Sequence, residues 1–172
     1  MEGALVADRD PLQFFLDKSN PDPWKAVIRL SRAVGDDARK AGLSDQLIEL
    51  VNLRVSQING CAYCLDLHTR YAVEAGISAQ RLGALAAWWE AKNLYTEQER
   101  AALHLAQEVT NVDDIDAVQA AQLIAFGQLT EEQYAAVQWV AMTMNLTNRI
   151  SILSHHPVRP NKDSRQALGE QP

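Results

Sequence analysis

Helix start and stop signals recur along the whole chain, and they constrain its fold more than any other feature. Ser44 and Ser78 stand as N-cap residues before segments with helical apolar periodicity. The sequences TEQE at 96–99 and TEEQ at 130–133 have the pattern of a capping box. Alternation of apolar and polar residues, which would indicate strands, is almost absent. The sequence therefore predicts an all-α fold.

The expected helices are separated by residues that begin or end helices. Asp22 as the N-cap and Pro23 at the first helical position begin one helix, and Gly42 ends it. The pair Asn59-Gly60 breaks the chain between two later helices. We expect helices over residues 23–41, 44–58, 61–75 and 79–92, further helices that start near residues 96, 113 and 130, and a final helix end near Leu153. These bounds predict a compact bundle of seven to eight helices.

Length and charge restrict the domain organisation and the classes of partner. A chain of 172 residues fits one domain, which we expect over residues 1–155, followed by a polar tail over 156–172. The net charge of −6 and the lack of a basic stripe argue against a nucleic acid partner. No apolar run approaches the length of a bilayer span, and the first residues lack the pattern of a signal peptide. We therefore expect a cytoplasmic protein without a membrane partner.

The stretch NGCAYCLDLHTRYA holds the only two cysteines, Cys61 and Cys64. The helix break before them places both in the first turn of a helix, where residues three apart share a face. The free N–H groups and the positive dipole end of a helix favour thiolate over thiol. His68 follows Cys64 by four residues and lies one turn further along the same face. In a reducing compartment such a pair is typical of redox catalysis or of metal binding.

Glu49 is the carboxylate that this arrangement brings toward the cysteines. It lies in the preceding helix within the apolar sequence LIELVNLRV. A short Asn-Gly turn folds that helix back against the cysteine helix, so Glu49 faces the turn that carries Cys64 and His68. A carboxylate in an apolar helix needs a partner, and His68 is suitable. Alternatively, Glu49, Asn52 and Ser56 form a solvated stripe, because their spacing of three and four residues also permits that.

Three roles stay open for the cysteines from their chemistry alone: a redox pair, a zinc site, or two buried apolar residues. Cys61, Cys64, His68 and Glu49 could supply the four ligands of a structural zinc site. No second CxxC or HxxxH motif exists, however, and three ligands on one short helical segment make a strained tetrahedron. A purely structural role leaves the helix-start position and His68 unexplained. The pattern favours redox chemistry.

Together, Glu49, Cys61-Ala62-Tyr63-Cys64 and His68 in this register resemble the alkylhydroperoxidase AhpD family, within the carboxymuconolactone decarboxylase-like superfamily. The close match covers about residues 43–75. Tyr63 takes the place of a histidine found in the best-studied type of AhpD, which removes one possible proton carrier. The decarboxylase branch lacks the cysteine pair, so ring-lactone decarboxylation is not expected.

This resemblance implies both a fold and an activity. It implies an AhpD-like helical fold that assembles as a homotrimer or homohexamer. It also implies a thiol peroxidase that reduces a hydroperoxide substrate and is re-reduced by a dithiol or lipoyl-type reductant protein. By position, Cys64 resembles the attacking cysteine and Cys61 the resolving one, while Glu49 and His68 resemble the proton relay. No organic cofactor and no metal are expected, because the cysteines carry the electrons.

From the residues and the resemblance together, we interpret the chain as a thiol-disulfide oxidoreductase with peroxidase activity. The alternative is a non-enzymatic redox sensor or binding module that uses the same disulfide as a switch. Cys64 lies nearer to His68 and is expected to react first with peroxide. Cys61, at the mouth of the helix, is expected to be more accessible to an external reductant.

Four polar residues near the end of the chain are assigned local roles. His155 and His156 precede a proline at a helix end, where a histidine can satisfy terminal carbonyls. Asn145 and Asn148 lie in an amphipathic segment that is expected to be core. For these two asparagines a hydrogen-bonding role is expected in preference to a pocket-lining one.

Overall fold

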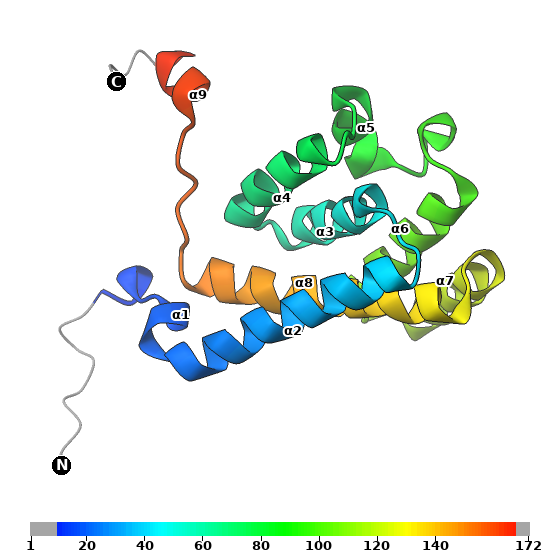
Figure 1. Ribbon diagram of the computed structural model, residues 1–172, viewed down its shortest axis with the longest axis horizontal. Coiled ribbons are helices and arrows are strands. Elements are labelled where there is room, and N and C mark those ends of the chain that lie inside the picture. The colour runs from blue at the N-terminus through cyan, green and yellow to red at the C-terminus, as the bar shows by residue number, and fades with distance from the viewer. Residues whose placement is uncertain (1–9, 168–172) are drawn as a thin grey trace.

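A computed structural model describes residues 10–167 of the chain, and in that range the regular secondary structure is entirely helical (Figure 1). The all-α prediction is confirmed. Two of the α-helices, α1 and α9, are short segments that no apolar periodicity marks. The α-helices are α1 (Leu16–Ser19), α2 (Pro21–Lys40), α3 (Asp45–Asn59), α4 (Ala62–Glu74), α5 (Ala79–Ala84), α6 (Glu97–Thr110), α7 (Ile115–Gln128), α8 (Glu131–Leu153) and α9 (Lys162–Ala167), with short 3-10 helices over Pro11–Gln13, Leu85–Ala87 and Lys92–Leu94.

Helix α3 is central, because it packs into two hydrophobic clusters at once. Leu47, Val51 and Val55 belong to the larger cluster, which α3 forms with α2, α6, α7 and α8. Leu50 and Leu53 belong to the smaller one, formed with α4, α6 and the segment between α5 and α6. In Figure 1, α3 lies between α4 and α8. A helix that is buried on opposite sides is held firmly, so α3 is a rigid base for the residues at its C-terminal end.

Most of the capping residues expected from the sequence are present. The Ser44 hydroxyl accepts a hydrogen bond from the Leu47 N–H at the start of α3. Thr96 and Thr130 each form the expected capping box, at the starts of α6 and α8. Helix α3 ends at Gly60, whose φ of +69° lies in the left-handed region that favours glycine. These local signals explain why most of the expected helix bounds are correct.

The expected start of the first long helix is wrong. Helix α2 begins at Pro21, with Asn20 as the N-cap, and Asp22 lies inside its first turn. The first backbone hydrogen bond joins the Trp24 N–H to the Asn20 carbonyl, at 3.3 Å. The first residues of a helix have no intrahelical acceptor for their N–H groups. Both Pro21 and Pro23 therefore fit in the first turn at no loss of hydrogen bonds.

The helix expected over residues 79–92 is also shorter than predicted, since α5 ends at Ala84 and a 3-10 helix follows. A continuing α-helix would have the Leu85 N–H donate to the Arg81 carbonyl. Instead, the Tyr95 hydroxyl donates to that carbonyl, and the Leu85 N–H bonds to Leu82. A tertiary hydrogen bond from a later segment thus replaces the local one.

The termini bear on three further expectations. Within residues 10–167, no helix is both long enough and apolar enough to cross a membrane. The leading residues 1–9, on which the signal-peptide expectation rests, lie outside the described range, as do residues 168–172 of the expected tail. Helix α9 lies within that tail, and the division into a domain over 1–155 and a tail over 156–172 stays a prediction.

Candidate active site

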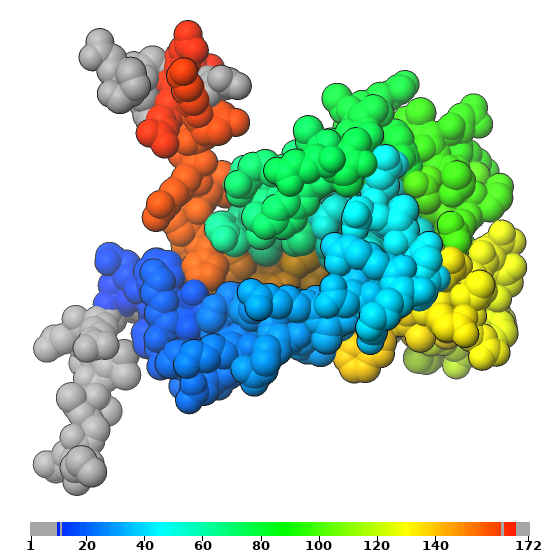
Figure 2. Space-filling view, in the orientation of Figure 1, coloured from blue at the N-terminus to red at the C-terminus, as the bar shows by residue number. Residues whose placement is uncertain are grey.

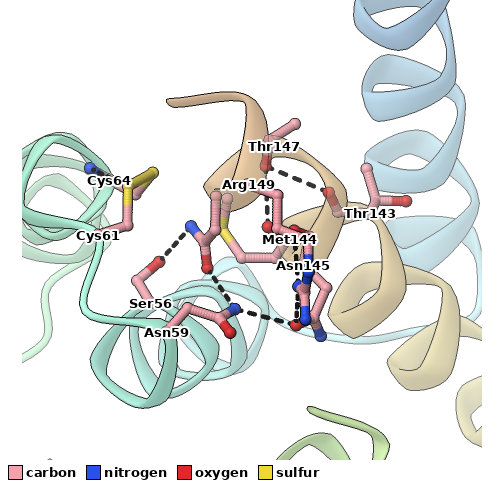
Figure 3. The surroundings of a disulfide bond; sticks show 10 residues. Ser56, Asn59, Cys61, Cys64, Thr143, Met144, Asn145, Thr147 and Arg149 are labelled. Atoms are coloured by element: carbon pink, nitrogen blue, oxygen red, sulfur yellow. Dashed lines mark hydrogen bonds between the residues drawn. A yellow bond between two sulfur atoms is a disulfide. The ribbon is translucent and has the colours of Figure 1, made fainter. Parts of the chain in front are cut away.

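The two cysteines lie at the start of α4, immediately after the turn at Gly60. Cys61 is the N-cap of α4, and its sulfur accepts a hydrogen bond from the Cys64 N–H at 3.3 Å. The two sulfurs are joined in a disulfide, drawn in yellow in Figure 3. The structure thus holds the pair in its oxidised form. Both residues are buried, with Cys61 1% and Cys64 4% exposed.

Glu49 and His68 meet across the α3–α4 hairpin. The His68 Nδ1 and a Glu49 carboxylate oxygen lie 2.7 Å apart, and each side chain is only 14% exposed. The Asn52 amide donates to the other carboxylate oxygen at 3.4 Å. The alternative of a solvated stripe does not hold, because Ser56, its third member, is completely buried.

The contact with Glu49 determines which nitrogen of His68 can act as a base. An ionised carboxylate accepts a hydrogen bond, so the proton of a neutral imidazole is placed on Nδ1. The ring also packs edge-on against Tyr71, with centroids 5.8 Å apart. Nε2 is then the unprotonated nitrogen. His68 lies on α4, one turn after Cys64. This arrangement can hold a basic nitrogen near a thiol.

A cavity of about 1460 Å³ opens beside this group of residues. Glu49, Cys64 and His68 all line it, whereas Cys61 does not. Figure 2 shows the opening as a hollow between α2 and α4, with part of α8 (orange) on its floor. The expectation that Cys61 is the more accessible cysteine is wrong for this oxidised chain. The reason is that the N-cap position at the start of α4 is itself buried.

A partly buried network of side-chain hydrogen bonds fixes that end of α3 against α8, as Figure 3 shows. The Asn59 side chain donates to the side-chain oxygens of Asn145 and Asn148, both at 2.9 Å. The Asn148 amide donates in turn to the Ser56 hydroxyl at 3.1 Å. The expected hydrogen-bonding role of both asparagines is therefore confirmed. Because only two residues separate the end of α3 from the start of α4, this network also determines where Cys61 lies.

His156 lies at another part of the cavity wall and does not have the role expected for it. Its ring contacts an Asp17 carboxylate oxygen at 3.2 Å and packs on Tyr63 and Phe15, with centroids 5.3 and 5.8 Å away. Its backbone N–H, and not its ring, bonds to the carbonyl of Ser151 near the end of α8. The N-terminal segment around α1 is thus held against α8, and sequence patterns gave no sign of a contact across 139 positions.

The zinc alternative gains no support from the geometry. Over the described residues, no group of three or more His, Cys, Asp or Glu side chains is placed to hold a metal ion. The four candidate residues therefore come together as a disulfide and a hydrogen-bonded carboxylate–imidazole pair.

Three comparisons with known proteins bear on this site. The model of the carboxymuconolactone decarboxylase family matches residues 25–108, a span that contains Glu49, both cysteines and His68. The uncharacterised protein YdfG of Bacillus subtilis (strain 168) is 38% identical over 104 residues, which are 60% of this chain and 70% of YdfG. A crystal structure from Agrobacterium tumefaciens has a TM-score of 0.76 and 29% identity, and covers 87% of this chain and 99% of its own. That protein is of unknown function and is described as a candidate antioxidant defence protein, AhpD.

Proposed function

Because the chain belongs to the carboxymuconolactone decarboxylase family and has an AhpD-like fold, we propose that it is a thiol-dependent peroxidase. The same CxxC pair makes it a thiol-disulfide oxidoreductase, and the substrate is a hydroperoxide. A dithiol or lipoyl-type protein is the reductant, and the working form is a cytoplasmic homotrimer or homohexamer.

The proposed reaction has two steps on the cysteines. The Cys64 thiolate attacks the terminal oxygen of the hydroperoxide, the O–O bond breaks, and the remaining alkoxide takes a proton and leaves as an alcohol. Cys64 is then a sulfenic acid. The Cys61 thiol attacks its sulfur, the disulfide forms, and the hydroxyl leaves as water. A dithiol restores both thiols and is itself oxidised to a disulfide. No organic cofactor or metal takes part.

In this scheme His68 moves the protons and Glu49 positions it. The His68 Nε2 takes the Cys64 thiol proton, directly or through water, and supplies a proton to the leaving alkoxide. Glu49 stabilises the imidazolium that exists between these events.

One observation carries the proposal: the buried Glu49–His68 pair, at 2.7 Å, lines the same cavity as the Cys64 side of the disulfide. A structural cysteine pair would need neither a histidine held in one tautomer nor access to a cavity. A redox sensor would share the disulfide, and catalytic turnover distinguishes the two.

The experiment is a steady-state assay of hydroperoxide consumption with a dithiol donor such as dihydrolipoamide. We expect many equivalents of peroxide to be reduced per subunit. A reaction that stops after one equivalent would refute the peroxidase and support the sensor, and absence of any reaction of the reduced protein would refute both.

The cysteine variants assign the two roles. Cys61→Ser should still form a sulfenic acid at Cys64, trapped by a dimedone-type reagent, but should not turn over. Cys64→Ser should be inert to peroxide. Fast reaction in Cys64→Ser together with its loss in Cys61→Ser would reverse the roles, because the helix dipole favours thiolate at Cys61 as well.

A further inference from the structure

The cavity wall carries a second histidine that is paired with a carboxylate. His156 lines the cavity, as Cys64 and His68 do. Its Nε2 lies 3.2 Å from an Asp17 carboxylate oxygen, and both side chains are 16% exposed. The corresponding value for Glu49 and His68 is 14%. Each histidine that lines the cavity in the described part of the chain is thus paired with a carboxylate and shielded from solvent to a similar extent.

Three parts of the fold hold the His156 ring in place. Phe15 stacks on it and Tyr63 packs against it, with centroids 5.8 and 5.3 Å away. Helix α1 lies beside the end of α8, because the Leu16 N–H donates to the buried Ser154 hydroxyl at 3.0 Å (Figure 1). Since Tyr63 stands between the two cysteines in the sequence, the ring contacts the segment that carries the disulfide.

The turn that ends α8 places this ring on the cavity wall. His155 has a φ of +48°, in the left-handed region, and its N–H bonds to the Ile152 carbonyl at 3.0 Å. The N–H of His156 then bonds to the Ser151 carbonyl at 3.2 Å, as at many helix ends. Residues other than glycine are uncommon in this region, and such strained positions cluster at functional sites. The chain thus accepts some backbone strain where it places His156.

The contact with Asp17 leaves one nitrogen of His156 able to act as a base. An ionised carboxylate accepts a hydrogen bond, so the proton of the neutral imidazole lies on Nε2. Nδ1 is then unprotonated, and no described residue donates a hydrogen bond to it. When Nδ1 takes a proton, the Asp17 carboxylate stabilises the imidazolium.

Other ionisable groups also reach the cavity from the elements around the ring. They are Lys18 of α1, Tyr63, Asp66, His68, Arg70 and Tyr71 of α4, and Arg159 beyond α8. Asp66 is paired with Arg70. Within the described residues, Asp17 is the group from this set and its own helix that hydrogen-bonds to the ring.

The burial of Cys61 directs an external reductant into this cavity. Cys61 is 1% exposed and does not line the cavity, whereas Cys64 does. A thiolate that enters from outside therefore attacks the Cys64 sulfur, and Cys61 leaves as a thiolate. The Cys64 N–H, which already bonds to the Cys61 sulfur at 3.3 Å, stabilises that charge at the start of α4. Because the attacking species is a thiolate, the thiol of the reductant first has to lose a proton.

We propose that His156 is the general base that deprotonates the thiol of the reductant in this cavity, with Asp17 as its positioning residue. This inference rests on the thiol-disulfide oxidoreductase function proposed above. It assigns the two histidines to different halves of the cycle. His68 serves the reaction of Cys64 with peroxide, and His156 serves the reduction of the disulfide.

The reduction balances as follows for a small dithiol. The Nδ1 of His156 takes the proton of the first thiol, and the resulting thiolate attacks the Cys64 sulfur. The Cys61–Cys64 bond breaks, and the Cys61 thiolate takes a proton from solvent, to which His156 returns its own. The second thiol then attacks the reductant sulfur that is bound to Cys64, and its proton passes to the departing Cys64 thiolate. The dithiol leaves oxidised to a disulfide, and both cysteines are thiols.

The first test follows the reduction of the oxidised full-length protein by dithiothreitol, with no peroxide present. Free thiols are trapped by alkylation and counted by intact mass. His156→Gln keeps an amide that can donate to Asp17 but has no group that takes a proton. The rate at pH ~7 should fall about tenfold, since only about 3% of a thiol with a pKa of ~8.5 is ionised there. His155→Asn is the matched control, because His155 is exposed and asparagine also tolerates a left-handed backbone, and it should react like the wild type.

The second test distinguishes a base from a structural contact by the dependence on pH. The defect of His156→Gln should shrink to within about twofold at pH ~10, where the thiol of the reductant ionises unaided. Asp17→Asn keeps a hydrogen-bond acceptor and removes the charge, so it should show a smaller defect with the same pH dependence. A wild-type rate of reduction in His156→Gln at neutral pH, or a defect of equal size at both pH values, would overturn the inference.

The third test compares the two halves of the cycle. His156→Gln should slow reduction by the dithiol more than oxidation by peroxide, and His68→Asn should show the reverse order. Equal losses in both reactions for His156→Gln would also overturn the inference. A pH-dependent loss of reduction in a protein that turns over no peroxide would keep the role of His156 and refute the peroxidase.

Discussion

Replacing Glu49 by glutamine removes one charge from the active site and leaves its shape almost unchanged. In the wild-type protein the His68 Nδ1 lies 2.7 Å from the Glu49 carboxylate. The side-chain oxygen of glutamine can still accept a hydrogen bond from this nitrogen. The tautomer of His68 is therefore kept. What is lost is the stabilisation of the imidazolium that forms when His68 takes the thiol proton.

The size of the effect follows from this contact. A hydrogen bond to a charged group contributes about 1.5–3 kcal/mol, and one between neutral groups about 0.5–1.5 kcal/mol, so the loss of charge costs about 1–1.5 kcal/mol. Solvent screens the pair little, because both side chains are only 14% exposed. At about 1.4 kcal/mol for each factor of ten, the reaction of Cys64 with peroxide should slow by roughly 5- to 12-fold.

The assay is stopped-flow oxidation of the reduced protein by peroxide between pH 6 and 8. Glu74→Gln is the matched control, because Glu74 is an exposed carboxylate on α4 and should react like the wild type. Glu49 acts through His68, so Glu49→Gln should add little to the loss in a His68→Ala background. A Glu49→Gln protein that reacts within twofold of the wild-type rate across this range would refute the relay.

Three further predictions concern stability and assembly. Asn148→Ala should lower the free energy of unfolding by about 1–3 kcal/mol, since the buried Ser56 hydroxyl loses its donor and the Asn59 amide keeps only Asn145 as an acceptor; urea unfolding measures it, and a loss under 1 kcal/mol would contradict the network. Burial raises the pKa of Tyr95, so its contribution to stability should be full below pH ~10 and should decline at higher pH as unfolded tyrosine ionises first. In Tyr95→Phe the melting temperature should decline less steeply as the pH rises, and a slope equal to that of the wild type would contradict this role of Tyr95. Sedimentation should give a mass of three or six chains, and a 19.1 kDa monomer at micromolar concentration would refute the oligomer.

The parts of the fold that sequence could predict are those fixed within a few residues. A serine or threonine N-cap and the backbone N–H that donates a hydrogen bond to it lie three positions apart, as at Ser44, Thr96 and Thr130. The early end of α5 depends on Tyr95, which lies fourteen positions from the carbonyl that it bonds. No local pattern encodes such a contact.

The same distinction applies to the candidate site. Glu49 and His68 are nineteen positions apart, but a short turn makes them neighbours, so their meeting could be anticipated. The cavity could not, because it needs α1, α2 and α8 to be placed around the hairpin. Nor could the contact of Asp17 with His156, because 139 positions separate the two residues.

The hairpin of α3 and α4 has a consequence for how such a protein can change. All four catalytic residues expected from the sequence, from Glu49 to His68, lie within one contiguous hairpin, whereas half of the residues that line the cavity belong to α1, α2 and α8. A large part of the molecular selectivity is therefore encoded outside the stretch that carries the sulfur chemistry. Substitutions in α2 or α8 can alter which molecules enter while the reacting groups stay as they are. Diversification of the substrate range and preservation of the reaction thus do not compete for the same positions.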